Sequence, residues 1–309
     1  MEENHRTPAI LIAGPTASGK SAAALQVAEA VDGEIINADA MQVYQDLRVL
    51  TARPAQDEMR RVPHHLYGKM DGAEKCSAGV WARQAAAIIE EVRARGRHPV
   101  IVGGTGLYFK ALDEGLSPIP DVPASVREAA QELYDDIGPD AFRQKVIAVD
   151  PLMARLPAAD RQRLVRAWEV FAHTALPLSE FQALPKRPLI EGPILKAIIN
   201  PPRETLYAHC DTRFDHMIAA GAVREVEALL ARQLPASLPV MKSLGVPELA
   251  SYLAGDADLE GATELAKRHT RRFAKRQMTW FNGQTADWPR FADAKEAVAF
   301  LVENCSITG

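Results

Sequence analysis

The residues from Gly14 to Ser21, which read GPTASGKS, constrain the fold of this chain more than any other stretch. They match a phosphate-binding loop, in which a glycine is followed by four residues, a second glycine, a lysine and a serine or threonine. The apolar run before the loop, residues 9–12, predicts a buried strand, and the alanine-rich residues 21–31 predict a helix. A strand, a glycine loop and a helix in this order direct backbone N–H groups at one anion.

The loop offers two further groups to such an anion. Lys20 would add a positive point charge, and the Ser21 hydroxyl is placed to hold Mg²⁺. The alternative is a glycine turn that matches the pattern by chance. The residues that we expect to contact the phosphate are Gly14, Pro15, Thr16, Ala17, Ser18, Gly19, Lys20 and Ser21.

Composition excludes several classes of protein. Of 309 residues, 47% are hydrophobic and 25% are charged, as in an ordinary globular protein long enough for a sizeable core. No apolar run approaches a membrane span, and the polar N-terminus MEENHRTP lacks the apolar centre of a signal peptide. Cys76, Cys210 and Cys305 are isolated and odd in number, which predicts reduced thiols. We therefore expect a cytoplasmic protein with no membrane partner.

Polar residues follow two more predicted strands, at 34–37 and 99–102. Asp39 comes just after the first, where an α/β fold places its chemistry, and is a candidate general base or metal partner. Thr105 follows the second within a glycine-rich turn, which lets backbone approach a ligand closely. The alternative for both residues is a helix N-cap, a role that suits Asp and Thr.

Two proline-rich segments, at residues 118–123 and 184–193, divide the chain. Only helical patterns lie between them, and a strand at 194–199 follows. Alternating strands and helices before the first segment predict a mostly parallel α/β sheet. We therefore expect a core domain formed by residues 1–121 and 193–309, with a helical insertion domain at 122–192.

Positive charge is concentrated in two places although the formal net charge is −4. The insertion carries Arg155, Arg161, Arg163 and Arg166, a cluster that suits phosphate recognition. Six of the ten residues from Lys267 to Arg276 are Lys or Arg, and aromatic residues accompany them. Basic and aromatic residues together favour a nucleic-acid partner. A solvated helix face is the alternative for both clusters.

The residues alone leave the reaction open. A phosphate loop usually binds ATP or GTP, but a hydrolytic motor also needs a strand that ends in aspartate, and Asp39 is the single candidate. A small-molecule kinase fits if Asp39 is the base and the insertion closes as a lid. A transfer reaction with diphosphate as leaving group fits equally, because each reaction places negative charge in the same loop.

Five segments resemble a known family in content and order: GPTASGKS, NADAMQVY, VGGTGLYFKAL, QRLVRAWEV and RRFAKRQMTWF. This is the order seen in bacterial tRNA dimethylallyltransferases, and the resemblance extends from about residue 9 to 284. It implies a P-loop core like that of nucleotide kinases, interrupted by a helical insertion. Two positions depart from the family pattern. Ala40 stands where serine is usual, and Asn282 where arginine is common.

The resemblance also implies a reaction. The exocyclic amine of the tRNA adenosine 3′ to the anticodon attacks dimethylallyl diphosphate, and diphosphate leaves with Mg²⁺ as cofactor. Asp39 matches the base, and Thr105 and Arg213 match residues that contact the diphosphate. The adenine is expected to flip into a channel between core and insertion.

The resemblance assigns tRNA contacts to four groups of positions. These are Asp39, Ala40, Met41 and Gln42; Arg127; Gln162, Arg163, Leu164, Val165 and Arg166; and Lys275, Arg276, Gln277 and Trp280. Rival interpretations are an adenylate isopentenyltransferase, a small-molecule P-loop kinase and a nucleic-acid-binding protein whose loop senses nucleotide. We expect a monomer, because the sequence shows no obvious self-complementary apolar patch.

Overall fold

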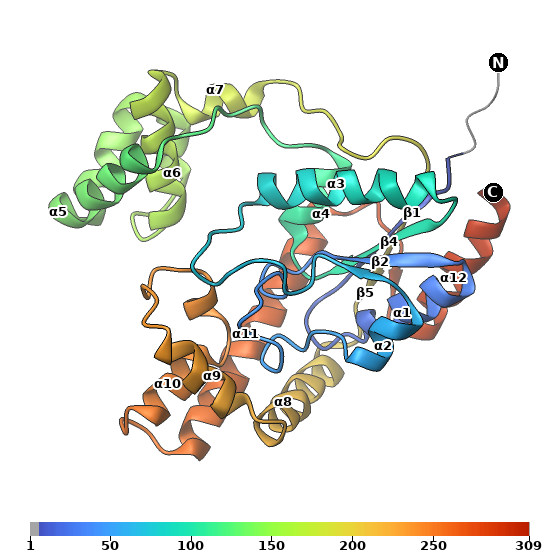
Figure 1. Cartoon of the computed structure of the whole chain (residues 1–309). Helices are drawn as coiled ribbons and strands as arrows, with labels where there is room; N and C mark the ends of the chain where they lie inside the picture. Colours follow the sequence, from blue (N-terminus) through green and yellow to red (C-terminus); the bar gives the residue numbers. More distant parts are fainter. Residues whose placement is uncertain (1–5, 309) are drawn as a thin grey trace. The chain divides into compact units, whose positions relative to one another are not determined.

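The computed structural model describes residues 6–308, with side chains as far as residue 305 (Figure 1). Residues 1–5, part of the segment expected to lack a signal peptide, lie outside the described residues. No helix within residues 6–308 is long and apolar enough to cross a membrane. In chain order the elements are β1 (Ala9–Ala13), α1 (Lys20–Ala30), β2 (Gly33–Asn37), α2 (Gln56–Arg61), β3 (His64–His65), α3 (Ala78–Ala94), β4 (His98–Gly103), α4 (Gly106–Asp113), α5 (Ala124–Val149), η1 (Pro151–Arg155), α6 (Arg161–Thr174), α7 (Leu178–Ala183), β5 (Ile194–Ile199), α8 (Arg203–Ala219), α9 (Ala222–Ala231), η2 (Val240–Lys242), α10 (Val246–Leu253), α11 (Leu259–Gln284), β6 (Arg290–Phe291) and α12 (Ala294–Thr308).

The strands form one parallel sheet in the order β3-β2-β4-β1-β5-β6. Central β1 pairs with β4 on one side and with β5 on the other, so its residues are all buried. The four strands expected from apolar runs are confirmed as β1, β2, β4 and β5. The edge strands β3 and β6 were missed because two residues are too few to show a pattern.

Helices cover both faces of the sheet. On one face, α1 and α12 pack side by side over alternate strand residues such as Ile10, Ile12 and Val100 (Figure 1). On the other face lie α3 and α4, which contribute the buried Trp81 and Phe109. Burying each large side chain of this kind contributes about 1.5–3 kcal/mol. The two helical layers therefore hold the sheet, and with it the ends of its strands, in place.

The chain after β5 is mostly helical, and one interruption between its helices was not expected. A single helix over residues 203–230 was expected, but α8 ends at Ala219 and α9 begins after Gly221, whose φ is 100°. The glycine-bounded helix expected within 239–253 is confirmed as α10, which begins after Gly245 and ends before Gly255, and the short η2 precedes it. Helices α8 and α11 pack together, and their shared apolar cluster reaches Ala17 of the phosphate loop.

Residues 114–188 form a compact unit of their own, apart from the unit made of the preceding and following chain. The boundaries of this helical unit lie a few residues before the expected 122 and 192. Its longest helix, α5, is kinked at Gly138 and Pro139, because proline cannot continue the hydrogen-bond ladder. Phe142, Leu164 and Val170 are fully buried in the core of this unit.

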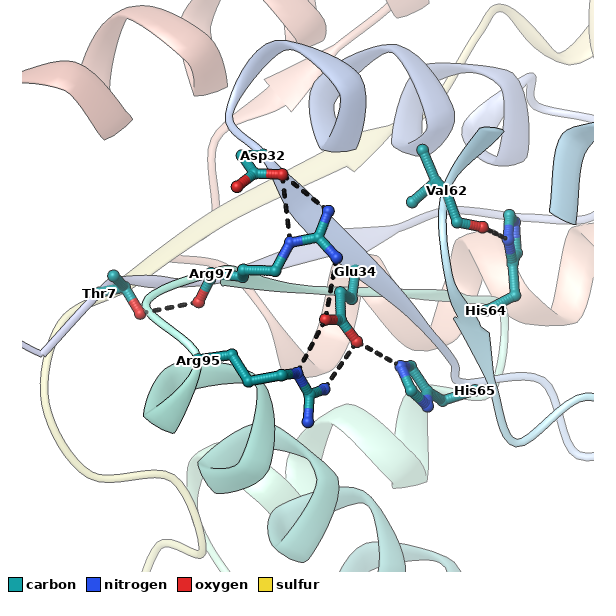
Figure 2. A network of polar contacts seen from close by, with 8 residues as sticks. All are labelled: Thr7, Asp32, Glu34, Val62, His64, His65, Arg95 and Arg97. Carbon is teal, nitrogen blue, oxygen red and sulfur yellow. Dashed lines mark hydrogen bonds and ion pairs between the residues drawn. The ribbon is translucent and has the colours of Figure 1, made fainter. Parts of the chain in front are cut away.

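A buried carboxylate ties the start of β2 to its neighbours (Figure 2). The Glu34 side chain is 4% exposed and accepts hydrogen bonds from Arg95, Arg97 and His65, at distances from 2.7 to 3.1 Å. Burial alone would raise the pKa of Glu34, but the hydrogen bonds and charges of Arg95 and His65 outweigh it and hold the pKa below the ordinary 4.5. Ionised Glu34 therefore joins β2, β3 and the turn before β4.

Replacing Glu34 with Gln tests this network. We expect the free energy of unfolding at pH 7 to fall by about 1–3 kcal/mol, because the cations lose a charged hydrogen-bond acceptor. Since folding lowers the pKa of Glu34, its stabilisation is present above pH 4.5 and is lost as pH falls through the folded value. Urea unfolding of both proteins from pH 7 down to pH 3.5 should show the difference shrinking below pH 4.5.

Glu29→Gln is the matched control, because Glu29 pairs with Arg61 at an exposed site. It should cost less than about 1 kcal/mol. An equal loss in both variants, or a Glu34→Gln difference that does not change with pH, would contradict the role assigned to Glu34.

Candidate active site

Three loops adjoin at one edge of the sheet. Because β2, β4 and β1 are neighbours and parallel, the segments after them start at the same edge. The phosphate loop follows β1, Asp39 follows β2 and Thr105 follows β4. Two hydrogen bonds hold the segments after β2 and β4 together. The Ala40 N–H donates to Thr105 Oγ1 at 2.9 Å, and the Thr105 N–H donates to the Ala38 carbonyl at 3.2 Å. The structure therefore brings the candidate catalytic residues to one place.

A cavity of about 620 Å³ opens onto the phosphate loop. The loop residues 16–21 form one wall, and Asp39 and Gln42 lie beside them. Helix α8 contributes Arg213, and residues 52–55 contribute the rim. The remaining lining residues are Ala22, Leu25, Ile35, Glu58, His64, Tyr67, Val102, Gly103, His209, Thr212 and His216. A cavity of this size suits a small organic ligand.

The phosphate loop is folded as an anion cradle. Helix α1 begins at Lys20, so its first N–H groups have no partner within the helix and are available to a ligand. The Lys20 ammonium and the Ser18 N–H both bond the Pro15 carbonyl, at 3.0 and 3.3 Å. The Ser18 hydroxyl is buried and has no hydrogen-bond partner among the described residues. Such an orphaned donor is what a phosphate oxygen would satisfy.

Two cations lie beside the loop, of which Lys20 is buried and Arg213 is half-buried. Burial lowers the pKa of the Lys20 ammonium from 10.5 to about 8; the charge of Asp39 opposes this shift, and that of Arg213 adds to it. Burial also lowers the pKa of Arg213, whose principal opposing charge is again Asp39. The single carboxylate of Asp39 thus interacts with two desolvated cations, which leaves net positive charge beside the loop. An isolated buried charge is costly, and an anionic ligand removes that cost.

Asp39 is fixed by its backbone and by one of its carboxylate oxygens. Its N–H donates to Asn37 Oδ1 at 2.8 Å, and its Oδ1 accepts from the Met41 N–H at 2.9 Å. The bond from the Met41 N–H corresponds to the capping role that was the alternative for Asp39, and it occupies only one of the two carboxylate oxygens. No hydrogen bond or ion pair within the described residues reaches Oδ2. Because Asp39 lines the cavity, it has a carboxylate oxygen available as a proton acceptor.

Thr105 does not cap a helix through its side chain. Its Oγ1 accepts from the Ala40 N–H, which belongs to the segment after β2. A hydroxyl that accepts in this way still has a proton to donate. The bond comes from the backbone of residue 40, so it does not depend on whether that side chain is alanine or serine.

The basic helix α11 carries both paired and unpaired cations. Lys267 is paired with Asp215 and Glu264, and Arg271 with Asp211. Further along, three cations are exposed and have no ion pair among the described residues; with Thr279 they line a depression of about 360 Å³. They are Arg272, Lys275 and Arg276. The unpaired cations are thus available to external phosphates.

Gln277 was expected to contact tRNA, but its side chain is buried in this structure. Its side chain is 6% exposed, and its amide bonds the Thr16 N–H and the Gly104 carbonyl of two site loops. The Trp280 ring is half-buried and stacks edge-on with Phe281. Of the expected α11 contacts, Lys275 and Arg276 are therefore the exposed ones.

The expected contacts in the insertion also differ in exposure. Gln162 and Arg163 are exposed, whereas the side chains of Leu164 (0% exposed) and Val165 (6%) lie in the apolar core. The side chains of Leu164 and Val165 therefore hold α6 in its unit and are not exposed at its surface. They fall on the buried side because α6 presents one apolar stripe to α5.

Two acidic residues that the sequence did not single out position others. Glu169, 3% exposed, pairs with Arg166 of its own helix at 2.5 Å and with Arg127 of α5 at 3.5 Å. Glu225 accepts from three consecutive backbone N–H groups, those of residues 48–50, at 2.5 to 2.9 Å. It therefore pins the segment that continues into the cavity rim at 52–55. The contacts of Glu169 with Arg127 and of Glu225 with residues 48–50 are tertiary, so no sequence pattern marks them.

Comparison with known proteins identifies the family. The IPP transferase family matches residues 42–284. The chain belongs to the IPP transferase family. It is 52% identical over 302 residues to the tRNA dimethylallyltransferase of Phenylobacterium zucineum, covering 96% of this chain and 98% of that protein, and 47% identical over 300 residues to that of Maricaulis maris, covering 96% and 97%. The resemblance inferred from the motifs is confirmed.

Solved structures agree with this assignment. A tRNA isopentenylpyrophosphate transferase from Bacillus halodurans matches with a TM-score of 0.68 and 29% identity, covering 98% of this chain and 99% of that chain. A eukaryotic dimethylallyltransferase acting on tRNA matches with a TM-score of 0.76 and 27% identity, covering 89% and 70%. The expected P-loop α/β fold is thereby confirmed for this IPP transferase.

The pKa of Lys20 predicts how anion binding changes with pH. Methyl diphosphate is a suitable probe, because its own ionisation is nearly complete by pH 8. The anion binds best when Lys20 is protonated, so its association constant should rise towards pH 8 as the probe ionises and then fall about tenfold per pH unit above pH 8. Titration calorimetry from pH 6.5 to 10 measures this.

Lys20→Arg is the matched control, because arginine stays charged over the whole range. Its association constant should not fall above pH 8. Wild-type binding that stays constant up to pH 10 would contradict the placement of Lys20 in the cradle.

Proposed function

We propose that this protein transfers the dimethylallyl group of dimethylallyl diphosphate to the N6 amine of the tRNA adenosine 3′ to the anticodon, and releases diphosphate. The names and near-complete coverage of the relatives support it. The observation that carries the proposal is the pairing of two features in one cavity. A carboxylate with an available oxygen, Asp39, lines the same cavity as an excess of buried positive charge.

The residues of the site supply two functions in the reaction, a proton acceptor and a cradle for the leaving group. An exocyclic aromatic amine is a weak nucleophile, so its proton must leave as the new N–C bond forms. Asp39 Oδ2 accepts this proton. As the allylic C–O bond breaks, its electron pair stays on the diphosphate, whose charge Lys20, Arg213 and the first N–H groups of α1 stabilise. The Thr105 hydroxyl donates a hydrogen bond to an oxygen near the breaking bond.

Mg²⁺ fits this donor set. The Ser21 hydroxyl opens to the cavity at the start of α1. The described residues contain no cluster of three or more His, Cys, Asp or Glu side chains that could hold a metal. Mg²⁺ commonly keeps several waters and takes its other ligands from substrate phosphates and one or two side chains. Bound here, it would neutralise part of the diphosphate charge, with Ser21 as its protein ligand.

Recognition of tRNA is assigned to two exposed cations of α11 and to three arginines of the insertion, of which Arg127 and Arg166 are half-buried and paired with Glu169. Lys275 and Arg276 of α11 would meet backbone phosphates, and Arg127, Arg163 and Arg166 would do so in the insertion. Trp280 and the segment from Asp39 to Gln42 are assigned to the flipped nucleotide. We propose a monomer that acts in the cytoplasm, where its substrate is found.

An acceptor competition tests the reaction against its rivals. The protein is incubated with Mg²⁺, dimethylallyl diphosphate and ATP, together with an anticodon stem-loop that has adenosine 3′ to the anticodon, or with AMP. We expect mass spectrometry to find prenylated adenosine at that position of the RNA. Prenylated AMP alone would indicate an adenylate isopentenyltransferase, and phosphorylated product a kinase; either would overturn the proposal.

Asp39→Asn removes the base and nearly preserves the shape of the side chain. The single-turnover rate of prenylation should fall by about 10²–10⁴-fold, the usual contribution of general base catalysis. The dissociation constant for tRNA, measured by filter binding, should change less than about threefold. A loss of binding as large as the loss of rate would show that Asp39 is a tRNA contact and not the base.

Removing the exposed cations of α11 tests tRNA binding. In Lys275→Gln/Arg276→Gln, two phosphate contacts are lost, so the slope of log K against log salt should become shallower by about 1.5–2. Lys267→Gln is the control, because Lys267 is already paired with acidic residues and should barely change the slope. Equal slopes in the wild type and the double variant would contradict the assignment of α11 to tRNA.

A further inference from the structure

A buried glutamine connects helix α11 with two loops of the site. Gln277 Oε1 accepts from the Thr16 N–H of the phosphate loop at 2.8 Å, and its Nε2 donates to the Gly104 carbonyl at 2.9 Å. The loops follow β1 and β4, and the residues joined are 261 and 173 positions away in sequence. One carboxamide thus spans both loops.

The packing around this carboxamide is close. A Cβ atom on Gly104 would lie 2.2 Å from Gln277 Nε2, and one on Gly106 would lie 2.1 Å from the Trp280 ring. Real atoms do not approach so closely, so a side chain at either position would displace Gln277 or Trp280. Helix α11 therefore rests directly on the backbone of the loop that carries Thr105, and a shift of the helix would move that loop.

The Thr16 N–H is also withdrawn from ligand binding. Because it already donates to Gln277, the cradle is left with the N–H groups at the start of α1, the Ser18 hydroxyl and the Lys20 ammonium. The glutamine thus determines which donors of the phosphate loop face an anion. An exposed RNA contact at this position would have neither effect.

We propose that Gln277 is a positioning residue, which sets the distance between the leaving-group cradle and the Thr105 loop and ties both to the helix that binds RNA. This inference rests on the proposed function. Lys275 and Arg276 are exposed on the same helix turn, so RNA held by them is placed at a fixed distance from the diphosphate. Reaction between two bound substrates depends on such placement, since a misplacement of about 1 Å costs about a hundredfold in rate.

The chemistry of the carboxamide explains why glutamine is needed. It has an acceptor at one oxygen and donors at the adjacent nitrogen, and it is neutral. Glutamate of the same length would accept from Thr16 but, when ionised, would not donate to Gly104, and it would place negative charge next to the diphosphate. Methionine has a similar shape and replaces neither hydrogen bond.

The test uses full-length Gln277→Met and Gln277→Glu, with Gln26→Met and Gln26→Glu as controls on the exposed face of α1. Single-turnover prenylation at saturating RNA, the KM for dimethylallyl diphosphate and the tRNA dissociation constant are measured for each. We expect both Gln277 variants to lose about ten- to a hundredfold in rate. The donor KM should rise, most in Gln277→Glu, and the tRNA dissociation constant should change less than threefold. The Gln26 variants should match the wild type.

Each other outcome has a distinct meaning. Weaker tRNA binding with a normal single-turnover rate would make Gln277 an RNA contact and overturn the proposal. A normal rate, donor KM and tRNA affinity would also overturn it. Equal proportional losses of every parameter, together with a lower melting temperature, would indicate a merely structural role. If the wild type itself prenylates no RNA, the proposed function fails instead.

Discussion

The buried positive charge beside the phosphate loop is the constraint on which the rest of the structure depends. Lys20 and Arg213 are both desolvated, and the carboxylate that interacts with both is Asp39. Leaving charge unbalanced in a buried place costs stability, and the fold must offset that cost elsewhere. It does so with a sheet covered on both faces by helices. The cost is relieved when a diphosphate enters, and this is the same interaction that stabilises the leaving group as its bond breaks.

The parallel sheet determines where the other groups lie. With β4 between β1 and β2, the residues after these three strands meet at one edge. The base Asp39 is held by its own turn, and Thr105 is held by the neighbouring backbone. Glu34 anchors β2 near its other end through two arginines and a histidine. The site is therefore assembled mainly by hydrogen bonds between side chains and backbone groups.

The sequence predicted the parts of this structure that depend on local pattern. The four longer strands were visible because each contains adjacent large apolar residues, and the phosphate loop was visible because its glycines and lysine have fixed spacing. The edge strands β3 and β6 were too short to show a period. The break at Gly221 was missed because a helical pattern continues on both sides of it.

Tertiary contacts could not be inferred in the same way. Leu164 and Val165 fall within a motif that resembles an RNA-binding segment, but the packing of α6 on α5 buries them. Gln277 lies in a basic stretch, and only the approach of Gly104 and Thr16 shows that its amide is engaged inside the protein. Glu169 pairs with an arginine of another helix, and Glu225 accepts hydrogen bonds from backbone N–H groups distant in the sequence. The roles of both residues are therefore visible only in the folded structure.

The central claim is that the cradle holds a departing diphosphate and not a phosphoryl group in transfer. The most direct measurement is a ³¹P NMR time course with enzyme, Mg²⁺, an anticodon stem-loop, dimethylallyl diphosphate and ATP in one sample. We expect the two resonances of the donor to be replaced by the single resonance of inorganic diphosphate, one equivalent per prenylated adenosine, while the ATP resonances stay constant. Conversion of ATP to ADP in step with product, or release of monophosphate from the donor, would contradict the claim.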